Sequence, residues 1–99
     1  MSTEVLQQEI YYKAELVFNS INNIDNLLKV SSVLIPKINI VERDEKKVVI
    51  EITTFASLSY KRTKIQRSIY GELITNPNLN LSEVNLLEFK EEAEIYDLI

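Results

Sequence analysis

In the first third of the chain, apolar residues recur every three or four positions, and this spacing limits what the segment can fold into. The spacing fits one face of a helix, and the residues are Leu6, Ile10, Ala14, Val17, Ile21, Ile24 and Leu28. The asparagine-rich stretch from Asn19 to Asn26 weakens the pattern, because asparagine prefers caps and turns to helix interiors. The spacing therefore predicts either one helix to about Leu28, or a helix that ends near Asn19 and a short second helix after it.

The middle of the chain has two segments in which apolar and polar residues alternate. The first follows Pro36, which holds Ile35 out of the helical region, and covers residues 37–40. The second covers residues 48–53, and the charged residues 43–47 separate the two. This pattern is typical of an antiparallel hairpin. A lone hairpin is marginally stable in water, so we expect its apolar face to pack on the helices or to pair with another chain.

The remaining residues predict two further helices. The first carries the apolar and aromatic residues Leu58, Tyr60, Ile65, Ile69, Tyr70 and Leu73. Ser57 or Ser59 would cap it and Asn76-Pro77 would end it, although a rival interpretation extends the second strand through Tyr60. The last helix follows Ser82, and its apolar stripe is Leu86, Phe89, Ala93 and Tyr96.

Together these segments predict an α+β fold with an N-terminal helix, a central antiparallel β-hairpin and two C-terminal helices. The chain has 99 residues, and we expect them to form a single domain over residues 1–99. A domain of this size has a modest core, so a partner would add to its stability.

The composition removes most of the residue types on which enzyme chemistry relies. The chain has no histidine, no cysteine and no tryptophan, and its one glycine is Gly71. It therefore offers no imidazole base or ligand, no thiol nucleophile and no glycine-rich phosphate loop. We expect a protein that is not an enzyme and has no cofactor, no metal site and no small-molecule ligand. Paired carboxylates remain the one catalytic alternative, and the sequence singles out no pair.

The location expected from the sequence is the cytoplasm. No apolar segment approaches the length needed to span a bilayer, and the first residues lack the pattern of a secretory signal. The absence of cysteine also suits a reducing compartment. We therefore expect no membrane span.

Four basic residues cluster at the start of the first of the two predicted C-terminal helices. They are Lys61, Arg62, Lys64 and Arg67, with Tyr60 next to them. Such side chains can contact the phosphates of a nucleic acid. The net charge of −4 argues against a dedicated nucleic-acid-binding protein. The alternative is that the cluster pairs with the acidic last helix, whose charged residues are Glu83, Glu88, Lys90, Glu91, Glu92, Glu94 and Asp97.

Two arguments favour a homodimer. The hairpin needs cover, and the separate basic and acidic stretches could meet across a two-fold axis. The expected function is therefore that of a non-enzymatic homodimeric interaction module. The alternative is a nucleic-acid-binding protein that uses the basic cluster, and its affinity would fall steeply with salt.

Isoleucine, tyrosine, lysine and glutamate are abundant along the whole chain, for example in residues 10–18 and 40–50. In length and in this bias the chain resembles the small orphan proteins of filamentous viruses that infect hyperthermophilic archaea, the lipothrixviruses and rudiviruses. The asparagine content departs from the thermophile preference for few labile amides, and an AT-rich mesophile or its phage would have a similar composition. The resemblance implies a thermostable, virus-encoded protein of unassigned role and carries over no functional residue.

Overall fold

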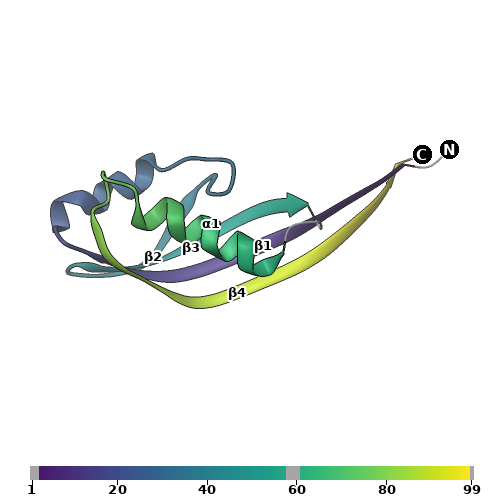
Figure 1. Cartoon of the computed structure of the whole chain (residues 1–99). Helices are drawn as coiled ribbons and strands as arrows, with labels where there is room; N and C mark the ends of the chain where they lie inside the picture. Colours follow the sequence, from purple (N-terminus) through teal and green to yellow (C-terminus); the bar gives the residue numbers. More distant parts are fainter. Residues whose placement is uncertain (1–2, 58–60, 99) are drawn as a thin grey trace.

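The computed structural model describes residues 3–57 and 61–98, with side chains within 7–57 and 61–92. Most of these residues form an antiparallel sheet (Figure 1). Its strands are β1 (Thr3–Phe18), β2 (Ile38–Asp44), β3 (Lys47–Ser57) and β4 (Leu81–Leu98), in the order β2-β3-β1-β4. The chain also forms the 3-10 helix η1 (Ile21–Lys29) and the α-helix α1 (Arg62–Ile74). The predicted arrangement of an N-terminal helix, a hairpin and two C-terminal helices is therefore wrong.

The predicted N-terminal helix is in fact the central strand β1. Its buried side chains are every second residue, namely Gln8, Ile10, Tyr12, Ala14, Leu16 and Phe18. Ile10 and Ala14 fit both interpretations, because a four-residue step is two strand repeats and also close to one helical turn. Tyr12, Leu16 and Phe18 follow only the two-residue repeat of a strand. β3 and β4 pair along the two sides of β1 and satisfy the backbone groups that a helix would have bonded internally.

The second half of that predicted helix is the separate element η1, which agrees with the alternative of a short second helix. The Ser20 hydroxyl accepts a hydrogen bond from the backbone N–H of Asn22 and caps the start of η1. Ile24 and Leu27 are buried in the core. The asparagine-rich stretch therefore marks the change from strand to 3-10 helix.

The predicted last helix is the edge strand β4. Its register against β1 shifts twice, and each shift inserts one extra residue into β4, first Ser82 and then Leu87. Such β-bulges interrupt the strict alternation of a strand. The β4 residues that oppose the buried positions of β1 from Ile10 to Phe18 are therefore unevenly spaced: Leu81, Val84, Leu86, Phe89 and Glu91. The three-residue step from Leu86 to Phe89 is also a common spacing on a helix face. This spacing is why the sequence predicts a helix here.

β2 and β3 form the antiparallel pair that the alternation predicts, with Ile38 opposite Ile52. The hairpin is covered within the same chain, because β3 also pairs with β1. Val48, Ile50 and Ile52 of β3 are fully buried. The need for cover, one of the two arguments for a homodimer, is therefore met by this chain itself.

α1 lies close to its predicted position and ends at Ile74, with Thr75 as its C-cap just before Asn76-Pro77. Its start differs from the prediction, because Lys61 occupies the N-cap position without a side-chain hydrogen bond. Of the two predicted caps, Ser57 is the last residue of β3, and Ser59 lies outside the described residues. The rival extension of the second strand through Tyr60 also falls outside them after Ser57.

α1 and η1 cover one face of the sheet (Figure 1). Ile65, Ile69 and Leu73 of α1 are buried in the same core as the inward-facing side chains of the strands. There the rings of Tyr12 and Phe89 meet edge to face, with centroids 6.3 Å apart. The result is a two-layer arrangement with the core between helices and sheet.

β1 and β4 continue together past the rest of the sheet. β3 pairs with β1 from Gln7 to Val17, whereas β4 pairs with β1 from Thr3 to Phe18. Over Thr3–Leu6 the described sheet is a two-stranded ribbon, which leads to both ends of the chain (Figure 1). The molecule is consequently 55 Å long and 22 Å across. Two paired strands by themselves are marginally stable in water.

Candidate functional site

The structure spreads out the basic residues that the sequence places together. Lys61, Arg62, Lys64 and Arg67 are all exposed, and Tyr60 lies outside the described residues. Arg62 turns towards β4, and Arg67 lines a groove beside β4. Lys64 instead lines a hollow beside β3, on the other flank of α1. The four side chains therefore do not make one continuous cationic face within the described part of the chain.

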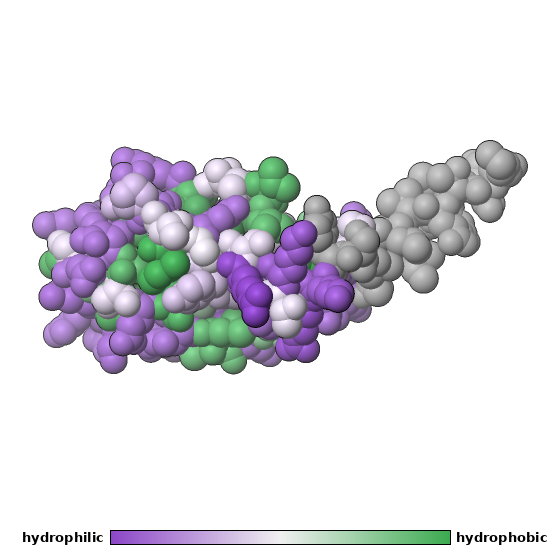
Figure 2. All heavy atoms as spheres, viewed as in Figure 1, coloured by the Kyte–Doolittle hydropathy of each residue, from purple (hydrophilic) through white to green (hydrophobic). Residues whose placement is uncertain are grey.

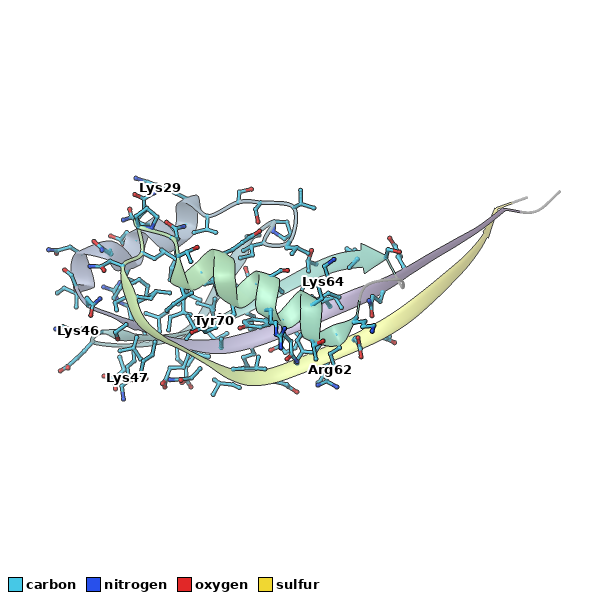
Figure 3. All side chains as sticks on the ribbon, in the orientation of Figure 1. Lys29, Lys46, Lys47, Arg62, Lys64 and Tyr70 are labelled. Carbon is cyan, nitrogen blue, oxygen red and sulfur yellow. The ribbon has the colours of Figure 1, made fainter. Side chains whose placement is uncertain are left out.

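The lysines of the β2–β3 turn lie too far away to extend this cluster. Lys46 and Lys47 are at the opposite end of the sheet from Arg62 and Lys64 (Figure 3). A phosphate backbone that followed α1 would therefore not reach them without crossing the length of the domain.

Arg62 links α1 to the edge strand. Its guanidinium lies over the Phe89 ring, 5.0 Å from the centroid, and donates a hydrogen bond of 3.4 Å to the Phe89 carbonyl oxygen. Basic α1 and acidic β4 are thus neighbours in one chain. The second argument for a homodimer was that these two stretches could meet across a two-fold axis, and their contact within one chain removes the need for such a meeting.

We expect Arg62→Ala to lower the free energy of unfolding by about 1 kcal/mol, because it removes a partly exposed cation–π contact and a long hydrogen bond. Urea denaturation of the purified chain measures this. Arg67→Ala, on the same helix, is the matched control and should change stability by less than about 0.5 kcal/mol. Equal effects of the two substitutions would contradict a specific contact of Arg62 with β4.

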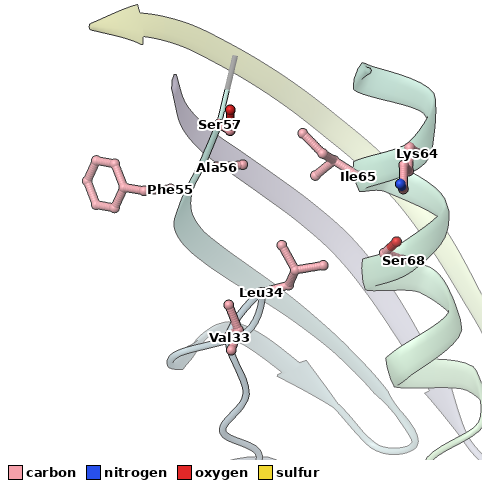
Figure 4. Close-up of a pocket in the computed structure, with 8 residues that line it drawn as sticks. All are labelled: Val33, Leu34, Phe55, Ala56, Ser57, Lys64, Ile65 and Ser68. Atoms are coloured by element: carbon pink, nitrogen blue, oxygen red, sulfur yellow. The ribbon is translucent and has the colours of Figure 1, made fainter. Parts of the chain in front are cut away.

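A hollow of about 360 Å³ lies between α1, the end of β3 and the loop that precedes β2 (Figure 4). Leu34, Ala56 and Ile65 give it an apolar floor, and Lys64 and Ser68 stand on its α1 side (Figure 4). The Thr54 hydroxyl contacts the Val33 carbonyl oxygen at 3.4 Å, which holds the loop against β3. No acid–base pair stands out among the described lining residues, so this hollow has the character of an apolar contact surface.

A second groove, of about 290 Å³, runs between α1 and β4. Its lining consists of Tyr12, Gln66, Arg67, Tyr70 and Leu86. Tyr70 is 45 % exposed and Leu86 44 % exposed. Leu87, the extra residue of the β4 bulge, is 53 % exposed beside them. Apolar side chains of this size on an edge strand are typical of a contact surface.

This groove could not be predicted from the apolar spacing, because that spacing places Leu86 on the buried stripe of a helix. One feature of the sequence could have indicated a contact surface here. It is the pair Leu86-Leu87 within a stretch rich in glutamate. Figure 2 shows one face of the molecule, where apolar side chains form separate patches on a mainly hydrophilic surface.

β4 itself is the longest element and lies at the edge of the sheet. An edge strand presents backbone N–H and C=O groups to which a further strand can bond. The residues of β4 that oppose the outward-facing positions of β1 are Glu83, Asn85, Glu88, Lys90 and Glu92. The open edge is therefore acidic on its outer face and apolar where it meets the groove.

The outer face of the sheet holds a polar network around Tyr11. The Tyr11 hydroxyl donates a hydrogen bond to the Glu51 carboxylate, and the Lys90 ammonium lies 5.8 Å from the Tyr11 ring centroid. Lys90 also forms an ion pair of 3.0 Å with Glu88. The hydrogen bond to Glu51, with smaller contributions from burial and from the charges of Glu51 and Glu88, raises the pKa of Tyr11 to about 12. A phenol with a raised pKa is a poor acid–base catalyst near neutral pH, so this network favours a structural role.

Tyr12, on the opposite face, also has a raised pKa of about 12, because of burial and secondarily because of Tyr70. Both folded-state pKa values exceed the ordinary value of 10.0, so the unfolded chain loses these protons first. The contribution of these two tyrosines to the stability of the fold is fully present below pH 10 and falls as the pH rises towards 12.

We expect Glu51→Gln to lower the pKa of Tyr11 towards 10, measured by the ultraviolet absorbance of ionised phenols. Glu15→Gln is the control and should leave the titration unchanged; a pKa of Tyr11 that stays near 12 without the Glu51 charge would contradict this cause.

Three further results bear on the site. The described residues contain no group of three or more carboxylates suited to hold a metal ion. Within the same residues, no helix has the length and apolarity to cross a membrane. No protein-family model, curated protein or solved structure matches this chain. The fold and site define a two-layer protein, an antiparallel sheet with helices on one face and an open, acidic edge strand beside an apolar groove.

Proposed function

We propose that this chain is a non-enzymatic interaction module that binds an extended protein segment at the β4 edge by adding a strand to the sheet. The observation that carries the proposal is the position of β4, an 18-residue strand at the sheet edge with exposed Leu86 and Leu87 in its middle. Strand addition uses the backbone groups of an edge for affinity and the neighbouring side-chain pockets for specificity.

The two-stranded ribbon supports the same surface. From Gln7 towards Thr3, β1 and β4 continue past Ser57, the last described residue of β3, and a ribbon of two strands gains stability from a third strand. A strand added along β4 would bond to the ribbon and to the body of the sheet together. The proposal thus gives a reason for the length of β4.

A second copy of the chain is the other candidate occupant, and the ribbon favours it, because two ribbons could pair around a two-fold axis. Against it, two β4 strands would bring their glutamates close together, and like charges opposite each other destabilise a strand pair. We therefore place a partner segment with basic side chains ahead of self-pairing.

The experiment uses the full chain with isotope-labelled amides and a fluorescent peptide of alternating valine and lysine. We expect saturable binding in fluorescence anisotropy, and amide shifts that follow β4. A peptide of alternating proline and lysine has the same charge but cannot form a strand ladder, so it should not bind. Equal affinity for the two peptides, or shifts that avoid β4, would overturn strand addition.

Two further measurements separate the alternatives. Sedimentation velocity of the chain alone should show a monomer; a dimer with β4 amides protected from exchange would assign the edge to a second copy. Labelled DNA, titrated at about 50 and 200 mM salt, should give a flat response. Tight, salt-sensitive DNA binding that is lost in Lys64→Ala would instead favour the nucleic-acid alternative.

A further inference from the structure

The two faces of β4 offer different chemistry to an added strand. Side chains of a strand alternate between the faces of its sheet, so every second residue of the added segment would lie on the outer face. The β4 positions on that face include Glu83, Glu88 and Glu92, with Lys90 as the basic exception. The intervening residues of the added segment would lie on the inner face, beside Leu86 and Phe89 at the groove and beside Glu91 further along β4.

The inner face has room for an apolar side chain. The groove between α1 and β4 measures about 290 Å³ and is lined by Leu86 on β4 and Tyr70 on α1, each almost half exposed. A cavity of about 150 Å³ suffices for a benzene-sized group. A leucine or aromatic side chain that entered from the edge would cover Leu86 and Tyr70 and would meet Tyr12 at the floor.

The outer face selects positive charge. Lys90 is already held there by the ion pair with Glu88 and lies over the Tyr11 ring, so it belongs to the sheet's own network. Glu83 and Glu92 flank that network along the edge. A basic residue on the added strand would lie next to these carboxylates, and opposite charges on neighbouring strands attract.

We infer that the β4 edge recognises an extended segment in which apolar and basic residues alternate, with an apolar side chain in the groove and basic side chains along the outer face. This inference rests on the proposed strand addition and adds its specificity. A second copy fits the pattern poorly, because its β4 would bring glutamates to the outer face. The occupant is therefore a segment of a different protein.

Three short peptides test the pattern on the full chain: alternating valine and lysine, alternating alanine and lysine, and alternating valine and threonine. We expect the first to bind about tenfold more tightly than either of the others, because the second lacks the groove contact and the third lacks the charge. Equal affinities with amide shifts still on β4 would overturn the inference while strand addition stands. Shifts that are absent from β4 for all three peptides would overturn strand addition itself.

Neighbouring leucines supply a matched pair of variants. Leu86→Ser removes a lining residue of the groove, so it should remove the preference for valine over alanine peptides. Leu87→Ser changes the same residue type one position away, outside the groove lining as the described residues define it, and should keep the preference. Thermal denaturation checks that both variants fold; a preference that survives in folded Leu86→Ser would overturn the role of the groove.

Discussion

Replacing Phe18 with alanine should lower the free energy of unfolding by about 3–5 kcal/mol. Phe18 ends β1 and is 1 % exposed, in the core that β1 shares with Ile24 and Leu27 of η1. Removing its ring takes away the transfer free energy of a large side chain and leaves a cavity that the surrounding strands fill only in part. A chain of this size has about 5–15 kcal/mol of stability in total, so the variant would be close to unfolding at room temperature.

The neighbouring residue gives the control for this prediction. Val17 lies one position earlier in β1, opposite Lys47 and Glu83 on the outer face. Val17→Ala should cost less than about 1.5 kcal/mol, because it removes less apolar surface and opens no cavity in the core. Chemical denaturation of both variants measures the difference. Similar losses for Phe18→Ala and Val17→Ala would contradict the strand alternation of β1.

This alternation was present in the sequence but ambiguous. Ile10 and Ala14 satisfy the period of a helix and of a strand equally, so the interpretation depended on their neighbours. Tyr12 is amphipathic, because its ring is apolar and its hydroxyl is polar. Its residue type therefore does not indicate whether the side chain faces the core or the solvent. The strand is decided by its pairing with β3 and β4, which lie about 40 and 80 residues away in the chain. Such distant pairs cannot be inferred from local spacing.

The bulges explain the second error. An extra residue such as Leu87 shifts the alternation by one position, and local patterns do not indicate where a bulge falls. By contrast, α1 and the β2–β3 pair could be predicted, because turn residues bound them and their partners are nearby. Asn76-Pro77 stops α1, and the charged turn residues separate β2 from β3.

The candidate site shows the same division between local and long-range information. The sequence shows that residues 83–92 are rich in glutamate and contain the pair Leu86-Leu87. It does not show that these leucines are exposed. Whether these residues lie on a helix face or on a sheet edge depends on pairing with β1. The groove requires α1 to lie beside β4, and Arg62, which was singled out for phosphate contact, helps to place it there.

The strand order itself leads to the last prediction, which concerns proline. Ala14 is fully buried in the central strand and pairs with Ile50 on one side and Leu86 on the other. Proline has no backbone N–H to donate to a ladder, and it is found essentially only in edge strands or at bulges rather than in the middle of a sheet. We expect Ala14→Pro not to fold, as judged by the loss of the cooperative thermal transition in circular dichroism.

Val41 provides the matched position on an edge. It is the extra residue at the irregularity of β2, is 44 % exposed, and edge strands and bulges are where sheets accept proline. Val41→Pro should therefore fold, with a melting temperature within about 8 °C of the parent, equivalent to a loss near 1 kcal/mol. A folded Ala14→Pro chain would contradict regular pairing of Ala14 with both β3 and β4. A Val41→Pro chain that unfolds would mean that β2 is paired on both sides, and either result would contradict the order β2-β3-β1-β4 on which the open β4 edge depends.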